Sequence, residues 1–272
     1  MELIIEPGRA AKNYWRDLWR YRELFYFLAW RDILVRYKQT VIGIAWAVIR
    51  PFLTTVVFTV VFSRIAKLPA PGAVPYALLV MAAMLPWQFF STALSESSNS
   101  LIMNANLVSK IYFPRLIVPA GSVITSFVDF LITLGLMGMM MLWYGFAPDW
   151  RLFLLPVFVI LAFGASFGIG LWLSALNVQY RDFRYIVPFI VQFGLYVSPV
   201  GFSSSVVPAK WQLLYCCNPM VGVIDGFRWS LLRGPTPLSI SAVGLSVFVT
   251  IVLCMSGVWY FRKMERTFAD VI

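Results

Sequence analysis

The chain has 272 residues, of which 60% are hydrophobic and 12% are charged, and its mean hydropathy is +0.79. Soluble globular domains are about 45–50% apolar and about 25% charged, so this composition excludes an ordinary soluble fold and predicts an integral membrane protein. The net charge of +10 does not indicate a nucleic-acid partner, because the basic residues gather near the N-terminus and in short breaks between apolar runs.

The N-terminal region, residues 1–39, combines aromatic and basic side chains. Its segment 13–38 carries too many charges to cross a bilayer, while its Trp and Tyr content suits the headgroup zone. We expect an amphipathic helix that lies on the cytoplasmic surface of the membrane. An ordinary soluble helix is the alternative.

Six apolar runs follow, each close to the roughly 20 residues that a membrane-spanning helix needs. They lie at residues 41–63, 75–97, 117–145, 152–176, 186–203 and 239–261. Residues 40–264 would form one transmembrane domain, followed by a cytoplasmic tail, 265–272. The expected fold class is an all-α integral membrane protein with six transmembrane helices and an N-terminal interface helix.

Charge predicts the orientation of these spans. With the N-terminus inside, most Lys and Arg residues fall on the cytoplasmic side, as the positive-inside rule requires. Both termini are then cytoplasmic. Residues 204–238, between spans five and six, are semi-apolar and rich in Pro and Gly, so we expect short re-entrant helices on the outer side. A plain periplasmic loop is the alternative.

The fourth run carries closely spaced small residues, among them Gly164, Gly168 and Gly170. Small residues let helix backbones approach closely in a membrane. They predict a packing surface on this span and say little about a substrate.

Several kinds of reactive site are missing from the sequence. Without His and with only three Cys, the chain offers no zinc site and no Ser-His-Asp arrangement. It has no GxxxxGK[ST] motif and so no P-loop. Glu96 and Asp129 are the only candidates for intramembrane carboxylates. We expect both near span ends, which disfavours a proton-driven transporter. We therefore predict no catalytic residue, metal or cofactor on this chain, and an energy source in another subunit.

Five groups of residues resemble, in order, the motifs of type-2 ABC exporter permeases, in the branch that exports lipid-linked O-antigen polysaccharides and teichoic acids. They are Arg31-Asp32 with 36–43, Trp46 and Pro51; LPWQFF at 85–90; 106–108 with 110–115 and Pro119; 177–182 with 198–200; and 218–220 with Arg228. Two residues depart from the family pattern: Ile42 stands where the family more often has Leu, and Arg50 matches no position of the pattern.

The resemblance implies a homodimer of six-span subunits that pairs with two copies of a separate ATP-binding subunit, which would hold ATP and Mg. It also implies a substrate, a long glycan on an undecaprenyl pyrophosphate carrier, that is moved across the bacterial inner membrane. The glycan itself, whether O-antigen, teichoic acid or capsule, is left open. Two other functions remain: a type-2 exporter of a small hydrophobic drug or haem-like molecule, and a non-transport membrane scaffold.

A glycan path needs aromatic surfaces, because the C–H faces of sugar rings are apolar. The candidate pore rings are Trp46, Phe52, Trp87, Phe89, Phe90 and Tyr196; such rings are also ordinary span residues. Arg50 would lie about 13 Å into span one, where a charge is costly and usually functional. We expect it to face the dimer pore and meet the pyrophosphate or the glycan, with snorkelling to the interface as the alternative.

The first cytoplasmic loop, residues 100–115, is the expected coupling helix for the ATP-binding subunit. The candidate contacts are Asn106, Lys110 and Arg115 in this loop, with Arg31, Asp32 and Arg36 in the N-terminal helix. A purely topological role for these charges is the alternative. The candidate residues of an outer gate are Asn218, Pro219, Asp225 and Arg228.

Overall fold

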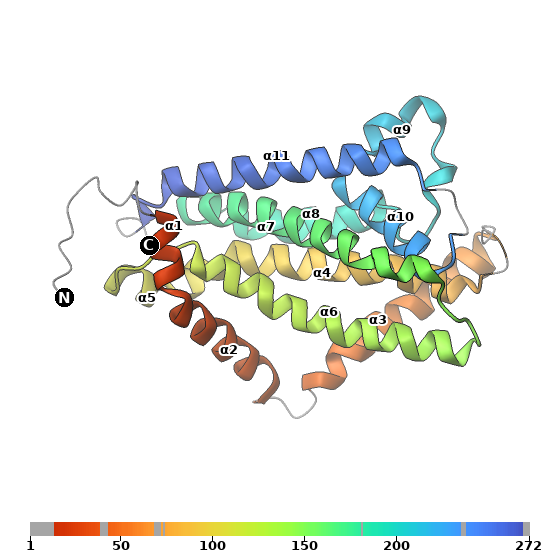
Figure 1. Cartoon of the computed structure of the whole chain (residues 1–272), viewed down its shortest axis with the longest axis horizontal. Helices are drawn as coiled ribbons and strands as arrows, with labels where there is room; N and C mark the ends of the chain where they lie inside the picture. The colour runs from red at the N-terminus through yellow and green to blue at the C-terminus, as the bar shows by residue number, and fades with distance from the viewer. Residues whose placement is uncertain are drawn as a thin grey trace.

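The computed structural model describes residues 14–38, 43–67, 72, 74–180, 182–234 and 238–268. Every regular element in these residues is a helix, which confirms the all-α class. Figure 1 shows long helices side by side, with short helices at the two ends of the bundle. We call these ends the α5 end and the α9 end, after α5 (Ala105–Lys110) and α9 (Ala209–Tyr215).

Five helical stretches of the described chain are long and apolar enough to cross a membrane. They are Ala45–Ile65, in α3 (Gly43–Thr59) and the π-helix η2 (Val60–Ile65); Tyr76–Met103 (α4); Ile117–Trp143 (α6); Trp150–Gln179, in η3 (Trp150–Leu154) and α7 (Leu155–Gln179); and Ile240–Met264 (α11). They match five of the six predicted spans. At the fifth predicted span, α8 (Phe183–Val197) has 15 residues, about 22 Å at 1.5 Å per residue. The crossing at 186–203 therefore stays a prediction.

The centre of the bundle is α4. In its most apolar window 83% of the residues are buried, against 11% in α3 and 17% in α11. It packs against α6 and α7 along its length and also against α10 (Pro219–Leu231). The chain thus covers α4 by itself and leaves most of α3 uncovered.

Glycines bring α7 and α11 into close contact. A Cβ on Gly168 would lie 2.7 Å from the backbone nitrogen of Cys254, and a Cβ on Gly257 would lie 2.4 Å from the carbonyl oxygen of Gly168. No side chain fits at such distances, so this approach requires glycine at both positions. The packing surface predicted for the fourth span is therefore confirmed.

The segment predicted to be helical at 13–38 forms two helices, α1 (Tyr14–Arg20) and α2 (Arg22–Lys38). At the α5 end, α1 lies beside the last turn of α11, where the Arg262 guanidinium is 4.5 Å from the centre of the Tyr14 ring. From there α2 slopes along α6 toward the start of α3 (Figure 1). Its Phe27 and Trp30 rings are exposed. A position on the membrane surface stays a prediction.

Short helices occupy the predicted outer segment 204–238. They are η4 (Ser204–Val206), α9 and α10. Whereas α10 is buried between α4, α7 and α11, α9 exposes Leu213 and Leu214. The segment is therefore more structured than a plain loop, and its depth in a membrane stays a prediction.

Candidate functional site

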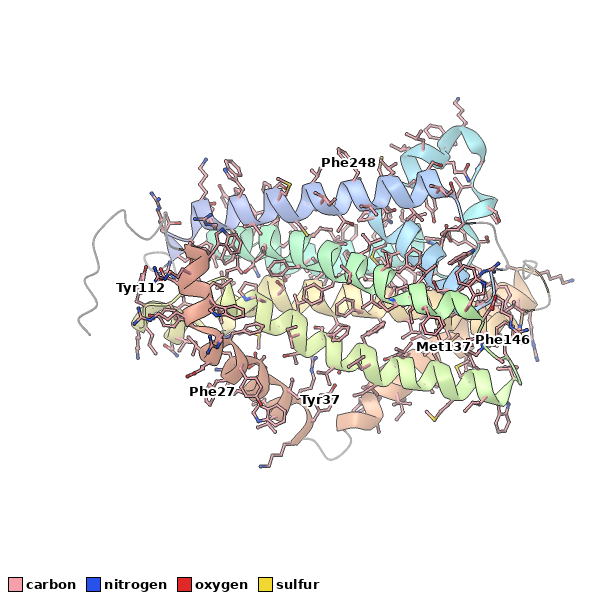
Figure 2. The ribbon with its side chains drawn as sticks, in the orientation of Figure 1. Phe27, Tyr37, Tyr112, Met137, Phe146 and Phe248 are labelled. Carbon is pink, nitrogen blue, oxygen red and sulfur yellow. The ribbon has the colours of Figure 1, made fainter. Side chains whose placement is uncertain are left out.

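A cavity of about 300 Å³ lies where α2, α3, α4 and α6 meet. It is lined by Arg36 and Tyr37 of α2; Trp46, Ala47, Arg50 and Pro51 of α3; Leu85, Gln88, Phe89, Thr92 and Glu96 of α4; and Ser126, Asp129, Phe130 and Thr133 of α6. Figure 2 shows Tyr37 at the end of α2, close to the start of α3. Charged, hydroxyl and amide groups meet aromatic rings here within an apolar bundle, which makes the cavity the leading candidate for a binding site.

An ion-pair cluster forms one side of this cavity. Arg36 donates from Nη1 to Oδ2 of Asp129 at 2.7 Å, and it also pairs with Glu96. The Tyr37 hydroxyl donates to Asp129, and the Ser126 hydroxyl donates to Glu96 at 3.3 Å. The side chains of the three charged residues are only 23–29% exposed. Because a buried charge is costly unless it is paired, this cluster holds the end of α2 against α4 and α6.

Tyr37 acts in this cluster as a hydrogen-bond donor. Burial, together with its hydrogen bond to Asp129, raises the pKa of the phenol above its ordinary value. The phenol therefore stays protonated at neutral pH, and its O–H donates a hydrogen bond to the Asp129 carboxylate.

Sequence reasoning missed this cluster. The prediction that both carboxylates lie near span ends is wrong for Asp129, which lies in the middle of α6. Arg36 is also a predicted contact for the ATP-binding subunit, and that role stays a prediction. A signal was present: two acids inside apolar runs require basic partners, and Arg36 stands just before the first span.

Arg50 and Trp46 form the α3 side of the cavity. They lie one helical turn apart, and the Arg50 guanidinium is 5.8 Å from the centre of the Trp46 ring, within cation–π range. Both side chains are exposed. Arg50 therefore lies at the rim of the cavity and faces out of the subunit, whereas Arg36 is held inside.

The predicted pore rings divide into an exposed and a buried group. Three are exposed, at 50%, 45% and 63% respectively: Trp46, Phe52 and Tyr196. Three are buried, at 4%, 2% and 7% respectively: Trp87, Phe89 and Phe90. Trp87 packs against Gly194 of α8, and Phe89 packs against Phe127 and Phe130 of α6. The buried rings belong to the core of the subunit, and among them Phe89 lines the cavity.

Arg31 joins α2 to the end of α4. It donates to Asp32 at 2.7 Å and to Asn104, the C-cap residue of α4, at 2.8 Å. Asn106 and Lys110 follow on α5 and are exposed. These predicted coupling residues thus lie together at one end of the bundle, and their contact with an ATPase stays a prediction.

Arg115 is held by the residue that follows α11. Its backbone N–H donates to Oε1 of Glu265 at 2.7 Å, and its guanidinium donates to the Glu265 carbonyl oxygen. Burial raises the pKa of Glu265 above its ordinary value, although the Arg115 N–H acts in the opposite direction. Burial, followed by the charge of Glu265, raises the pKa of Tyr14 on α1. The loop after α5, the end of α11 and α1 therefore form one junction.

Arg228 anchors the segment that follows α8. The side chain is 2% exposed and donates to the carbonyl oxygens of Leu79, Val200 and Phe202 at 3.2, 2.9 and 2.8 Å. This arrangement makes Arg228 a fixed anchor between α10, α4 and the chain that leaves α8.

The other predicted gate residues lie on or next to α10. Asn218 caps the helix, because its Oδ1 accepts from the Met220 N–H at 3.0 Å, and its Nδ2 donates to Ser198 at 3.0 Å. Pro219 is the first helical residue, a position that proline favours. Asp225 is half-buried on the same helix. A gating role for these residues stays a prediction.

A model of the ABC-2 type transporter family matches residues 23–232, which run from α2 to the end of α10. The chain belongs to the ABC-2 type transporter family. It is a multi-pass membrane protein, and the family implies an ABC transporter system with an ATP-binding partner. The resemblance seen in the sequence motifs is therefore confirmed.

Curated relatives align with nearly the whole chain. Two O-antigen export system permease proteins RfbA of Klebsiella pneumoniae are 26% identical over 246 residues and 27% identical over 244 residues. Each of these alignments covers 89% of this chain and 92% of the relative. The RfbA permease of Myxococcus xanthus is 26% identical over 259 residues, with 94% of this chain and 98% of the relative covered. These similarities support a transporter permease.

Proposed function

We propose that this chain is the permease subunit of an ATP-driven exporter of undecaprenyl-pyrophosphate-linked polysaccharide of the O-antigen type. The observation that carries the proposal is the similarity to three RfbA permeases over 89–94% of the chain. Exposed aromatic rings on α3 and α8 add to it, because they offer apolar surfaces to sugar rings.

The proposed topology has six crossings of the bacterial inner membrane, with α8 as the fifth. Although α8 is short, the chain continues beyond it through residues 198–201, which are buried in the bundle. The α5 end would face the cytoplasm, because α1 and the end of α11 meet there and carry many of the basic residues. Both termini would then be cytoplasmic.

A second copy of the chain would cover the face formed by α3 and α8. Both helices pack on α4. At the α9 end they converge, because a Cβ on Gly201 would lie 2.3 Å from the Phe62 ring of η2. Their outward side chains form a broad apolar surface, which in a membrane protein is covered by lipid or by a partner. In a homodimer, two such faces would enclose a path lined by Trp46, Phe52 and Tyr196, with Arg50 beside it.

Two copies of a separate ATP-binding subunit would dock at the α5 end. The sequence holds no P-loop of its own. The exposed Asn106 and Lys110 on α5 present polar groups to such a partner. Through the Arg115–Glu265 contact, force on this loop would also reach α11.

Deletion of the gene in its host tests the proposal. We expect loss of surface glycan with accumulation of lipid-linked polymer inside the cell, and restoration of both by the wild-type gene. Unchanged surface glycan would contradict polysaccharide export. A gain of sensitivity to hydrophobic drugs in the same strain would then favour a small-molecule exporter.

A further inference from the structure

We propose that the cavity between α2, α3, α4 and α6 binds one neutral sugar residue of the exported polymer. The inference rests on the proposed function and deepens it, because it assigns the sugar part of the substrate, rather than its pyrophosphate, to this cavity. The cavity belongs to one subunit and opens beside Arg50 and Trp46 on the uncovered face of α3.

The charges around the cavity favour a neutral ligand. Arg36 and Arg50 bring two positive charges, and Glu96 and Asp129 bring two negative charges, so the lining is formally balanced. Arg36 is already engaged by both carboxylates. An anionic pyrophosphate in this space would lie beside two carboxylates, and like charges at close range are unfavourable. A sugar residue without charge avoids this repulsion.

The polar groups supply what sugar hydroxyls need. A hydroxyl donates one hydrogen bond and accepts others, and an ionised carboxylate offers about four acceptor sites. Glu96 and Asp129 therefore retain acceptor sites beyond their bonds to Arg36, Tyr37 and Ser126. On α4 the Gln88 amide donates to the Thr92 hydroxyl at a long 3.4 Å, so both side chains can turn to a ligand.

Size and aromatic surface agree with this ligand. A volume of about 300 Å³ is at the lower end of the range for small-molecule sites. It suits one sugar ring and is too small to enclose the long polyprenyl chain of the carrier. The half-exposed Trp46 ring and the buried Phe89 ring are part of the wall. Such rings pack against the C–H faces of sugars.

The test uses this chain in complex with its ATP-binding subunit in lipid nanodiscs. The probe is a neutral oligosaccharide of one repeat unit, released from the surface glycan of the host without its carrier phosphate. Saturation-transfer NMR measures its binding to the wild type, to Trp46→Leu and to Thr92→Val. We expect each variant to bind about tenfold more weakly, the size of effect for one lost ring contact or hydrogen bond. The matched control is Trp259→Leu on α11, an exposed ring that is not part of the cavity lining, which should bind like the wild type.

Two outcomes would overturn the proposal. One is unchanged oligosaccharide binding in both cavity variants, provided that they assemble as the wild-type complex does on gel filtration. The other is displacement of the oligosaccharide by inorganic pyrophosphate together with loss of binding in Arg50→Gln, which would make the cavity an anion site.

Whole-cell export separates this inference from the proposed function. If deletion of the gene leaves surface glycan unchanged, polysaccharide export itself fails. If deletion abolishes surface glycan while Trp46→Leu and Thr92→Val support normal export and bind the probe normally, export stands and the sugar site in this cavity is wrong.

Discussion

The α4 side and the α3 side of this subunit are stabilised in different ways. Around α4, the chain buries 83% of the most apolar window, and glycines bring α7 and α11 into backbone contact. On α3, only 11% is buried, and aromatic side chains point away from the subunit. Packing within the chain is therefore sufficient for the first region, whereas the second needs lipid or a partner to cover it.

The ion-pair cluster lies at the boundary between these regions. It fastens α2 to α4 and α6 through Arg36, next to the uncovered α3. Substitutions in the packed region should therefore act mainly on stability, and substitutions on the α3 side mainly on export.

Gly168→Leu should be the most damaging change. A side chain there collides with the backbone of Cys254, and overpacking of this kind costs about 3 kcal/mol or more when the backbone must move. We expect loss of the monodisperse peak on gel filtration in detergent. Gly138→Leu on α6, where a Cβ meets nothing within 4 Å, should behave like the wild type. A well-folded Gly168→Leu would contradict the close approach of α7 and α11.

Arg228→Met should destabilise the α9 end. The change removes the donor to two buried carbonyl oxygens, of Leu79 and Val200, and to the partly buried one of Phe202, at a cost of about 2–3 kcal/mol. A thermal melt in detergent measures it. The control is Arg233→Met, because Arg233 is exposed, donates to the Ala147 carbonyl oxygen at 2.6 Å and lies over the Phe146 ring. Equal melting temperatures for the two variants would refute the anchoring role of Arg228.

Arg36→Gln should weaken the attachment of α2 by about 2 kcal/mol, because Glu96 and Asp129 lose their shared cation. The double variant Arg36→Gln/Asp129→Asn should recover part of the loss, since it removes one of the unpaired charges. A double-mutant cycle on the melting temperature measures this coupling. If the effects of the two single substitutions simply add in the double variant, the ion pair between Arg36 and Asp129 contributes nothing to stability.

Glu265→Gln should change how the melting temperature depends on pH more than it changes the highest melting temperature reached. Because burial raises the pKa of Glu265, the folded state holds its proton more tightly than the unfolded state. This contribution is fully present below the ordinary glutamate pKa and is lost as the pH rises through the raised pKa. Melting temperatures of the wild type should therefore fall across that window more steeply than those of the variant. If the melting temperatures of the wild type and the variant depend on pH in the same way, the raised pKa of Glu265 is contradicted.

Arg50→Ala should change stability least, by less than about 0.5 kcal/mol, because the side chain is exposed. Export of surface glycan should nevertheless fall strongly if Arg50 faces the substrate path. The matched control is Arg64→Ala on η2, which is also exposed and lies outside the cavity lining. Normal export by the Arg50→Ala variant would contradict a role of Arg50 in the substrate path. It would favour the alternative, in which the side chain snorkels to the membrane interface.

Much of the fold could be predicted because the relevant signals are local. Apolar length predicted five of the helices to within several residues, and small residues predicted the contact surface of α7. The cavity could not be predicted, because its charged residues come from four helices and only the folded bundle brings them together. Trp87 and Phe90 show the same limit: both are candidate pore rings by sequence, yet both are buried within the subunit.

Composition and the order of motifs thus determined the class of this protein: a helical membrane protein of a transporter family. Tertiary structure decided which side chains meet. In soluble proteins, a polar face tells which way a helix is turned. In a bilayer the surroundings of a helix are as apolar as the core of the protein. The sequence therefore does not tell how α3, α4 and α6 are rotated about their axes. Only the packing of the helices decides this rotation, and with it the pairing of Arg36 with Glu96 and Asp129.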